Sequence, residues 1–216
     1  MASTDARDRW AISGLLAGVT FIGAIAGGIK LAEGRPPRPG SDVEGVRKYW
    51  GGSKNAVRYS TTVQLISVGW LARFVLSVVK LTKRSRNKAL TAAAAYGGAL
   101  AVGSLAASAT TSMLLTGKAR EDDEKALRMA NGQFALGGPI HGVGFGLLTA
   151  ALALAGEQTG DLPKPVVVAG LVSAATGIAS PLYFLWEPAG WLIPIGRFPG
   201  LIVSGIAGVK LALRRR

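Results

Sequence analysis

Six long apolar segments constrain this chain more than any other feature of its sequence. Each contains about 20 residues or more, which is the length that an α-helix needs to cross the hydrocarbon core of a bilayer. Because lipid offers no hydrogen-bond partner to a bare backbone group, a helix is the structure expected for each segment. The pattern predicts an all-α fold, a polytopic transmembrane bundle of six helices in a single domain, residues 1–216. The predicted spans cover about residues 10–31, 59–81, 89–117, 129–156, 165–186 and 191–213.

The composition agrees with a membrane location. Charged residues make up 17% of the 216 residues, below the roughly 25% of a soluble domain. The formal net charge is +13, but the basic residues flank the apolar segments, where anionic lipid headgroups attract them. No basic groove with interleaved aromatic residues is present, so nucleic acid is not an expected partner. The expected partner is the lipid bilayer, with a membrane protein or a second copy of the chain as the candidate protein partner.

Clusters of Lys and Arg predict the orientation in the membrane. Segment 80–88, KLTKRSRNK, holds five basic residues and no acid, and three arginines close the chain at residues 214–216. With six spans, both clusters and both termini lie on the same side. Since basic loops stay in the cytoplasm, we expect a multi-pass protein of the bacterial inner membrane with both termini cytoplasmic.

The connection between the first two spans predicts a short extra helix. Residues 33–40, EGRPPRPG, contain prolines that exclude a helix. Residues 41–44, SDVE, then match a capping box, in which the Ser and Glu side chains satisfy free N–H groups at a helix start. Val46 and Trp50 follow on one face before two glycines at 51–52 end the helix. We expect an amphipathic helix on the outer membrane surface, with its aromatic side chains at headgroup depth; the alternative is a plain loop.

Small residues dominate the third span, which is nearly all Ala, Gly, Ser and Thr between positions 91 and 112. Association of helices in lipid depends on the close backbone approach that small residues allow. We therefore expect this helix to be the central one of a tight bundle. The alternative is that the small residues line a pore or a ligand cleft. The charged segment 118–128, KAREDDEKALR, is expected to extend the third or the fourth span beyond the bilayer.

Two ionisable residues fall near the middle of predicted spans, where such residues are costly and therefore candidates for function. Arg73 lies in the second span, and it either extends toward the headgroups, bonds a neighbouring helix or contributes to a ligand site. His141, the only histidine, follows Gly138 and Pro139, where we expect the helix to kink. It is either a neutral histidine bonded to a neighbouring carbonyl group or a group that binds a ligand or titrates.

Two glutamines complete the candidate set. Gln64 and Gln133 lie nearer the outer ends of their spans. They either extend a polar cleft that includes Arg73 and His141, or form hydrogen bonds between helices. Arg197 lies six residues after the start of the last span, at residue 191, and we expect it to be an anchor at the outer interface.

Several kinds of chemistry lack the residues they need. The chain has no cysteine, which excludes disulfides, thiolate nucleophiles and cysteine-bound metals, and its one histidine cannot supply both axial ligands of a haem. No Asp or Glu falls in the central part of a span, and no zinc-protease, nucleophile-elbow or phosphate-binding motif occurs. We therefore expect no metal, no cofactor and no enzyme activity. A membrane enzyme that acts on lipid or quinone without such a motif is the weakest alternative.

Three segments and the basic loop after the second span carry a family resemblance. The segments are RPGSDVEGVRKYW at 38–50, NGQFALGGPIHG at 131–142 and GDLPKPVVVAGLV at 160–172. On these, the chain from about residue 10 to 213 resembles an uncharacterised family of small bacterial membrane proteins with six helices and a domain of unknown function. The resemblance implies the six-helix architecture and no activity, and it assigns no role to Arg73 or His141.

The leading functional hypothesis is an integral inner-membrane protein that acts by protein or lipid interaction, as an accessory, scaffold or sensor subunit. The expected tight packing and the lack of a catalytic constellation support it. The alternative is a small transporter or ligand-binding membrane protein, with an outward-opening polar cleft near Arg73 and His141. A cavity that joins these two residues would favour the alternative, whereas a sealed bundle would favour interaction.

Overall fold

Helices form the secondary structure of the described part of the chain. The computed structural model describes residues 8–117 and 121–214, and no strand occurs in these two ranges. Six helical segments there are long and apolar enough to cross a membrane. The predicted all-α bundle of six helices is confirmed, and its composition is that of a multi-pass membrane protein. In chain order the elements are η1 (Arg9–Ile12), α1 (Ser13–Leu31), α2 (Val43–Gly52), α3 (Lys54–Arg84), α4 (Lys88–Leu115), α5 (Asp123–Ala135), η3 (Leu136–Ile140), α6 (His141–Gln158), α7 (Lys164–Ala179), η4 (Ser180–Phe184), η5 (Glu187–Trp191) and α8 (Leu192–Leu213).

The helix of the fourth span extends past its apolar segment. The fourth span consists of α5, η3 and α6 and starts at Asp123. Asp122 caps it by accepting a hydrogen bond from the backbone N–H of Lys125 at 2.9 Å, so this helix begins at its cap and not at the first apolar residue. The acidic part of segment 118–128 therefore extends the fourth span, while residues 118–120 lie outside the described residues.

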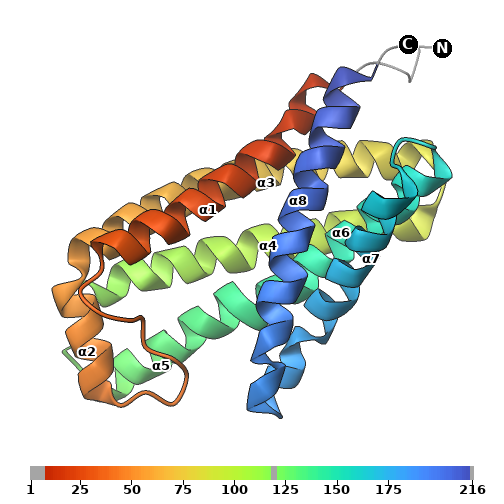
Figure 1. Ribbon diagram of the computed structural model, residues 1–216. Coiled ribbons are helices and arrows are strands. Elements are labelled where there is room, and N and C mark those ends of the chain that lie inside the picture. The colour runs from red at the N-terminus through yellow and green to blue at the C-terminus, as the bar shows by residue number, and fades with distance from the viewer. Residues whose placement is uncertain (1–7, 118–120, 215–216) are drawn as a thin grey trace.

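The bundle has two distinct ends (Figure 1). The start of α1, the α3–α4 turn, the α6–α7 turn and the end of α8 lie at one of them, which we call the terminal end. α2 and the start of α5 lie at the other, which we call the α2 end. α1 and α3 run side by side, and α8 crosses α1 obliquely near the terminal end.

Close backbone contacts hold the helices together where they cross. A Cβ atom added to Gly144 of α6 would lie 2.5 Å from the nitrogen of Ala101 in α4 and 2.8 Å from the oxygen of Gly97. A Cβ added to Gly14 of α1 would lie 2.6 Å from the oxygen of Ser204 in α8. No side chain fits at these positions, so glycine there allows the close packing that associates helices in lipid.

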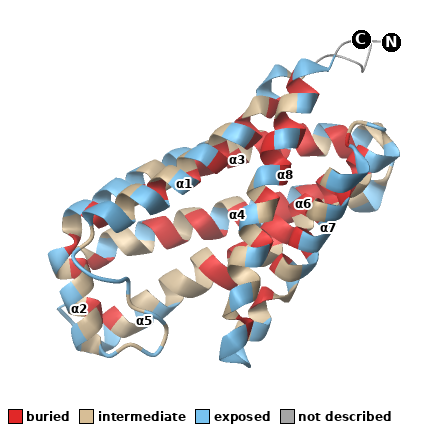
Figure 2. Cartoon of the chain, in the orientation of Figure 1, coloured by how far each residue is buried: buried red, intermediate tan, exposed pale blue. Residues whose placement is uncertain are grey.

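The most buried span is the fourth and not the third. Of its most apolar window, 72% is buried inside the protein, against 39% for each of the other spans. α4 packs its small residues on α3 and α6, but it leaves Tyr96 78% exposed on the opposite face; Figure 2 shows this separation of buried and exposed faces along the helices. The expectation of a central third span is therefore wrong, because small residues permit close contact without requiring it on every side.

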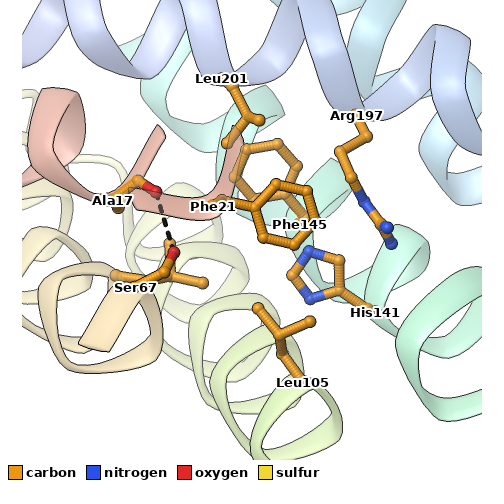
Figure 3. Close-up of a pocket in the computed structure, with 9 residues that line it drawn as sticks. Ala17, Phe21, Ser67, Leu105, His141, Phe145, Arg197 and Leu201 are labelled. Carbon is orange, nitrogen blue, oxygen red and sulfur yellow. Dashed lines mark hydrogen bonds between the residues drawn. The ribbon is translucent and has the colours of Figure 1, made fainter. Parts of the chain in front are cut away.

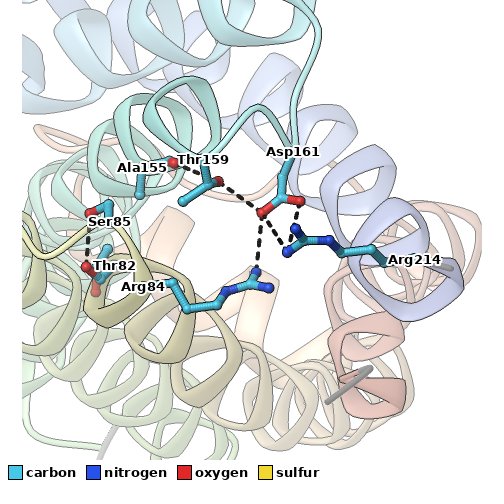
Figure 4. Close-up of polar contacts among 7 residues, drawn as sticks. All are labelled: Thr82, Arg84, Ser85, Ala155, Thr159, Asp161 and Arg214. Atoms are coloured by element: carbon cyan, nitrogen blue, oxygen red, sulfur yellow. Dashed lines mark hydrogen bonds and ion pairs between the residues drawn. The ribbon is translucent and has the colours of Figure 1, made fainter. Parts of the chain in front are cut away.

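One buried carboxylate ties the terminal end together (Figure 4). Asp161, in the α6–α7 turn, pairs with Arg84 at the end of α3 and with Arg214 after α8, each at 3.2 Å. The hydroxyl of Thr159 donates to the same carboxylate at 2.8 Å. The side chain of Asp161 is only 8% exposed, so its charge is stabilised by these partners and not by water.

α2 packs on the protein. Its start is capped by Asp42, whose carboxylate accepts from the backbone N–H of Gly45 at 2.7 Å, and not by the predicted capping box. Trp50 is 4% exposed, and its indole N–H donates to the hydroxyl of Ser112 in α4 at 3.3 Å. The short helix exists as predicted, but Trp50 packs against α3, α4 and α5, which give its face an apolar partner.

Candidate functional site

Five helices meet at a small cavity inside the bundle (Figure 3). Its polar side chains are Ser67 of α3, His141 of α6 and Arg197 of α8. The centre of a water molecule can move within about 20 Å³ of this cavity. On the same measure, a site for one bound water needs about 10–15 Å³. The cavity therefore holds one or two groups of the size of water and no larger organic ligand. Its walls are otherwise apolar and include Phe21, Leu105 and Phe145.

A π-helical turn leads into His141. Pro139 has no N–H and cannot complete the α-helical pattern, and η3 accommodates it as one π-helical turn. Two carbonyl groups of this turn receive donors from other elements: Ser180 donates to the oxygen of Pro139 at 3.1 Å, and Arg197 donates from Nη2 to the oxygen of Gly137. Neighbouring elements thus donate hydrogen bonds to two carbonyl groups within this irregular turn.

Arg197 is the charged residue of the cavity. Its guanidinium carbon lies 5.3 Å from the centre of the Phe21 ring, a distance typical of a cation–π contact. Its Nε is buried and has no hydrogen-bond partner among the residues that the structure describes. The side chain points into the bundle and lines the cavity, which the expectation of an anchor at the outer interface did not include.

His141 is held in one orientation by the neighbouring helix. It is 3% exposed, and its Nδ1 lies 3.0 Å from the carbonyl oxygen of Ala101. Since a carbonyl group only accepts hydrogen bonds, we assign a proton to Nδ1. The ring stacks on Phe145 with 5.6 Å between the ring centres, and its Nε2 edge faces the cavity (Figure 3). The predicted bond to a neighbouring carbonyl group is therefore present.

Arg73 does not take part in this site. Its guanidinium carbon lies 5.1 Å from the centre of the Trp10 ring, near the terminal end, and the side chain does not line the cavity. The predicted cleft that joins Arg73 to His141 is therefore not formed. The residue next to His141 is Arg197, which comes from α8 and not from α3.

The two glutamines also lie away from the cavity lining. Gln64 is half-buried on α3. Gln133 contributes its backbone oxygen, which accepts a hydrogen bond from the hydroxyl of Ser108 in α4 at 2.9 Å. The sequence analysis missed Ser67, whose hydroxyl donates to the carbonyl oxygen of Ala17 at 2.8 Å, since a lone serine in an apolar span gives no signal of its own.

The arrangement supports binding of a small polar group more readily than chemistry. Across residues 8–117 and 121–214, no cluster of three or more His, Cys, Asp and Glu side chains is placed to hold a metal ion. The described residues that line the cavity include no carboxylate, and the hydroxyl of Ser67 donates to the carbonyl oxygen of Ala17 and not to His141. Comparisons with protein-family models, curated proteins and solved structures give no match.

Proposed function

We propose that the chain is a membrane-embedded accessory, scaffold or sensor subunit that acts by association with another membrane protein or with a second copy of itself. One observation carries this proposal: the cavity at His141, among the described residues of the bundle, is small. This cavity accepts about one or two water-sized groups, whereas pockets for organic ligands measure about 300–1,000 Å³. A protein that works on a substrate needs a larger cavity or a path.

Exposed glycines on the lipid-facing side support association. A Cβ added to Gly69 of α3 or Gly103 of α4 would meet nothing within 4 Å. In lipid, such a position offers no side chain to the surrounding acyl chains, but it allows a partner helix to approach closely. α3 and α4 are neighbours in the bundle, so both positions can belong to one association surface.

The proposal also includes the location and the orientation. Both ends carry basic residues, but at the terminal end Lys83, Arg84 and Lys88 are clustered without an acid among them, whereas at the α2 end the acidic start of α5 lies among the bases. This distribution supports a bacterial inner membrane with the terminal end in the cytoplasm. The resemblance to a family of small six-helix bacterial membrane proteins stays a prediction.

The transporter alternative loses the site on which it was based. It requires Arg73 and His141 in one outward-opening cleft, whereas Arg73 contacts Trp10 and does not line the cavity at His141. The interaction proposal is therefore the one to test first.

Native mass spectrometry of the protein, extracted gently from its own membrane, tests the proposal. We expect a defined complex, either with one protein partner or with further copies of the chain. A monomer that retains one small organic molecule would contradict it.

Cross-linking locates the association surface, because the chain has no native cysteine. We expect Gly103→Cys to cross-link in the membrane to the partner or to a second copy. The control is Val168→Cys on α7, a position that is 60% exposed on another side of the bundle, and it should cross-link less.

A further inference from the structure

The charge of Arg197 has no acidic partner in the described structure. None of the ion pairs between described residues includes it, and the cavity that it lines contains no Asp or Glu. Its contacts are the ring of Phe21 and the carbonyl groups of Gly137 and Gly138. A guanidinium group in an apolar bundle is costly, and its partners there are opposite charges or backbone carbonyl groups; Arg197 has only the second kind among the described residues.

The hydrogen-bond donors of Arg197 are also only partly used. A guanidinium group has five N–H donors. The hydrogen bonds to Gly137 and Gly138 both come from Nη2, and the buried Nε has no partner in the described part of the chain. The site therefore combines positive charge with free donor capacity next to a small, partly open cavity.

The size of that space restricts what it can hold. About 20 Å³ is open to the centre of a water molecule, which is room for one or two groups of that size. Carboxylates with an acyl chain, quinones and phosphate esters are too large. A water molecule fits but does not compensate the charge.

We propose that this cavity binds one monovalent anion of halide size, with chloride as the natural candidate. Arg197 supplies the charge and the N–H donors, and Phe21, Leu105 and Phe145 exclude water from the anion. This site goes beyond the proposed association, and it does not depend on it. Anion binding is measured on the isolated protein, whereas association is measured on the complex.

His141 couples the anion to a proton. Its Nδ1 is engaged by the oxygen of Ala101, and its Nε2 edge faces the cavity. A lone pair on Nε2 repels an anion, whereas an Nε2–H group donates to it. The groups that face His141 from other elements are Phe21, Ser67, Leu105 and Arg197, of which only Arg197 is charged. The anion and a proton on His141 therefore bind together.

Thermal unfolding of the purified protein in detergent tests the site. The protein is titrated with sodium chloride at constant ionic strength, with sodium gluconate as the balancing salt, because gluconate is too large for the cavity. We expect saturable stabilisation, with a rise of about 5 °C in the unfolding midpoint at saturation. Equal midpoints in chloride and gluconate would overturn the proposal.

Three variants identify the residues that carry the effect. Arg197→Gln removes the charge, and Leu105→Phe fills the cavity while keeping Arg197, so both should lose the chloride-dependent rise. Arg73→Gln is the matched control, since it removes an arginine from a span outside the cavity, and it should keep the rise. If Arg197→Gln does not fold, the chloride-dependent rise in the unfolding midpoint of Leu105→Phe tests the proposal. A chloride effect of wild-type size in Leu105→Phe would place the anion elsewhere and overturn the proposal.

The pH dependence tests the part assigned to His141. The chloride affinity should rise as the pH is lowered, because protonation of Nε2 adds a donor to the site. His141→Phe should remove this dependence. An affinity in the wild-type protein that does not rise at the lower pH would overturn the coupling to a proton.

Discussion

Arg197 donates a hydrogen bond from Nη2 to the carbonyl oxygen of Gly137, within the π-helical turn that precedes His141. This bond joins α8 to the junction of α5 and α6, two segments that are 60 residues apart in the chain. It gives the turn a partner for a backbone oxygen, and it fixes the guanidinium group beside the cavity. The same side chain therefore stabilises the fold and forms the site.

Replacement of Arg197 should cost more stability than replacement of Arg73. Arg197→Leu leaves the Gly137 oxygen without its donor in an apolar environment, which should cost about 1–3 kcal/mol of unfolding free energy. Arg73→Leu loses a cation–π contact with Trp10, which is worth about 0.5–1 kcal/mol. Unfolding by sodium dodecyl sulfate in mixed micelles compares the two. Equal losses would contradict the structural role of Arg197.

Gly144→Ala should weaken the contact between α4 and α6. The added methyl group would meet the backbone of Ala101 and Gly97, which cannot move aside as a side chain can, and we expect a loss of about 1–3 kcal/mol. Gly103→Ala is the control, because nothing lies within 4 Å of its Cβ position and alanine favours a helix by up to about 1 kcal/mol. Chemical unfolding of both variants gives the comparison, and a stable Gly144→Ala protein would contradict the close approach.

Asp161→Asn should destabilise the terminal end. Arg84 and Arg214 would lose their shared counter-ion. Removal of one partner from a fully buried ion pair lowers the unfolding free energy by roughly 3–5 kcal/mol. Because both arginines are partly exposed, we expect a smaller loss of about 2 kcal/mol. The control is Asp123→Asn, which removes an ion pair with Arg47 in which the carboxylate of Asp123 is 61% exposed. This control should change the unfolding free energy by less than about 1 kcal/mol.

Trp50 should determine whether α2 stays docked. Trp50→Ala removes a buried ring, at a cost of about 3–5 kcal/mol, and should make the connection at residues 33–40 more sensitive to protease. Trp50→Phe keeps most of the apolar contact and loses the hydrogen bond to Ser112, at a cost of about 1 kcal/mol. Protection of the Trp50→Ala protein equal to wild type would show that other contacts hold α2.

Cysteine labelling in intact cells should reveal the orientation. Ser85→Cys lies in the turn between α3 and α4 at the terminal end, and Glu44→Cys lies on the exposed side of α2. A membrane-impermeant maleimide should label position 44 and not position 85, because basic loops remain in the cytoplasm. The opposite labelling would invert the proposed topology.

The sequence by itself determined the class of fold. Six apolar segments were sufficient for an all-α bundle, because a bilayer accepts a spanning segment only when its backbone is paired within the segment. The small residues indicated close helix contacts, and the Gly-Gly-Pro sequence before His141 indicated an irregular turn, since both depend on properties of single residues or short segments. The short helix over 43–52 was likewise predicted from its local pattern.

The tertiary structure alone decided which residues meet. Counting residues along each span predicted that Arg73 and His141 lie at a similar depth in the membrane. The guanidinium group that lines the cavity beside His141 is nevertheless that of Arg197. Depth along a span gives one coordinate of a side chain, whereas its neighbours also depend on the direction in which it points and on the crossing of α8 over α1. For the same reason Trp50 lies inside the protein and α6 is the most buried span, because burial depends on the helices that surround each face.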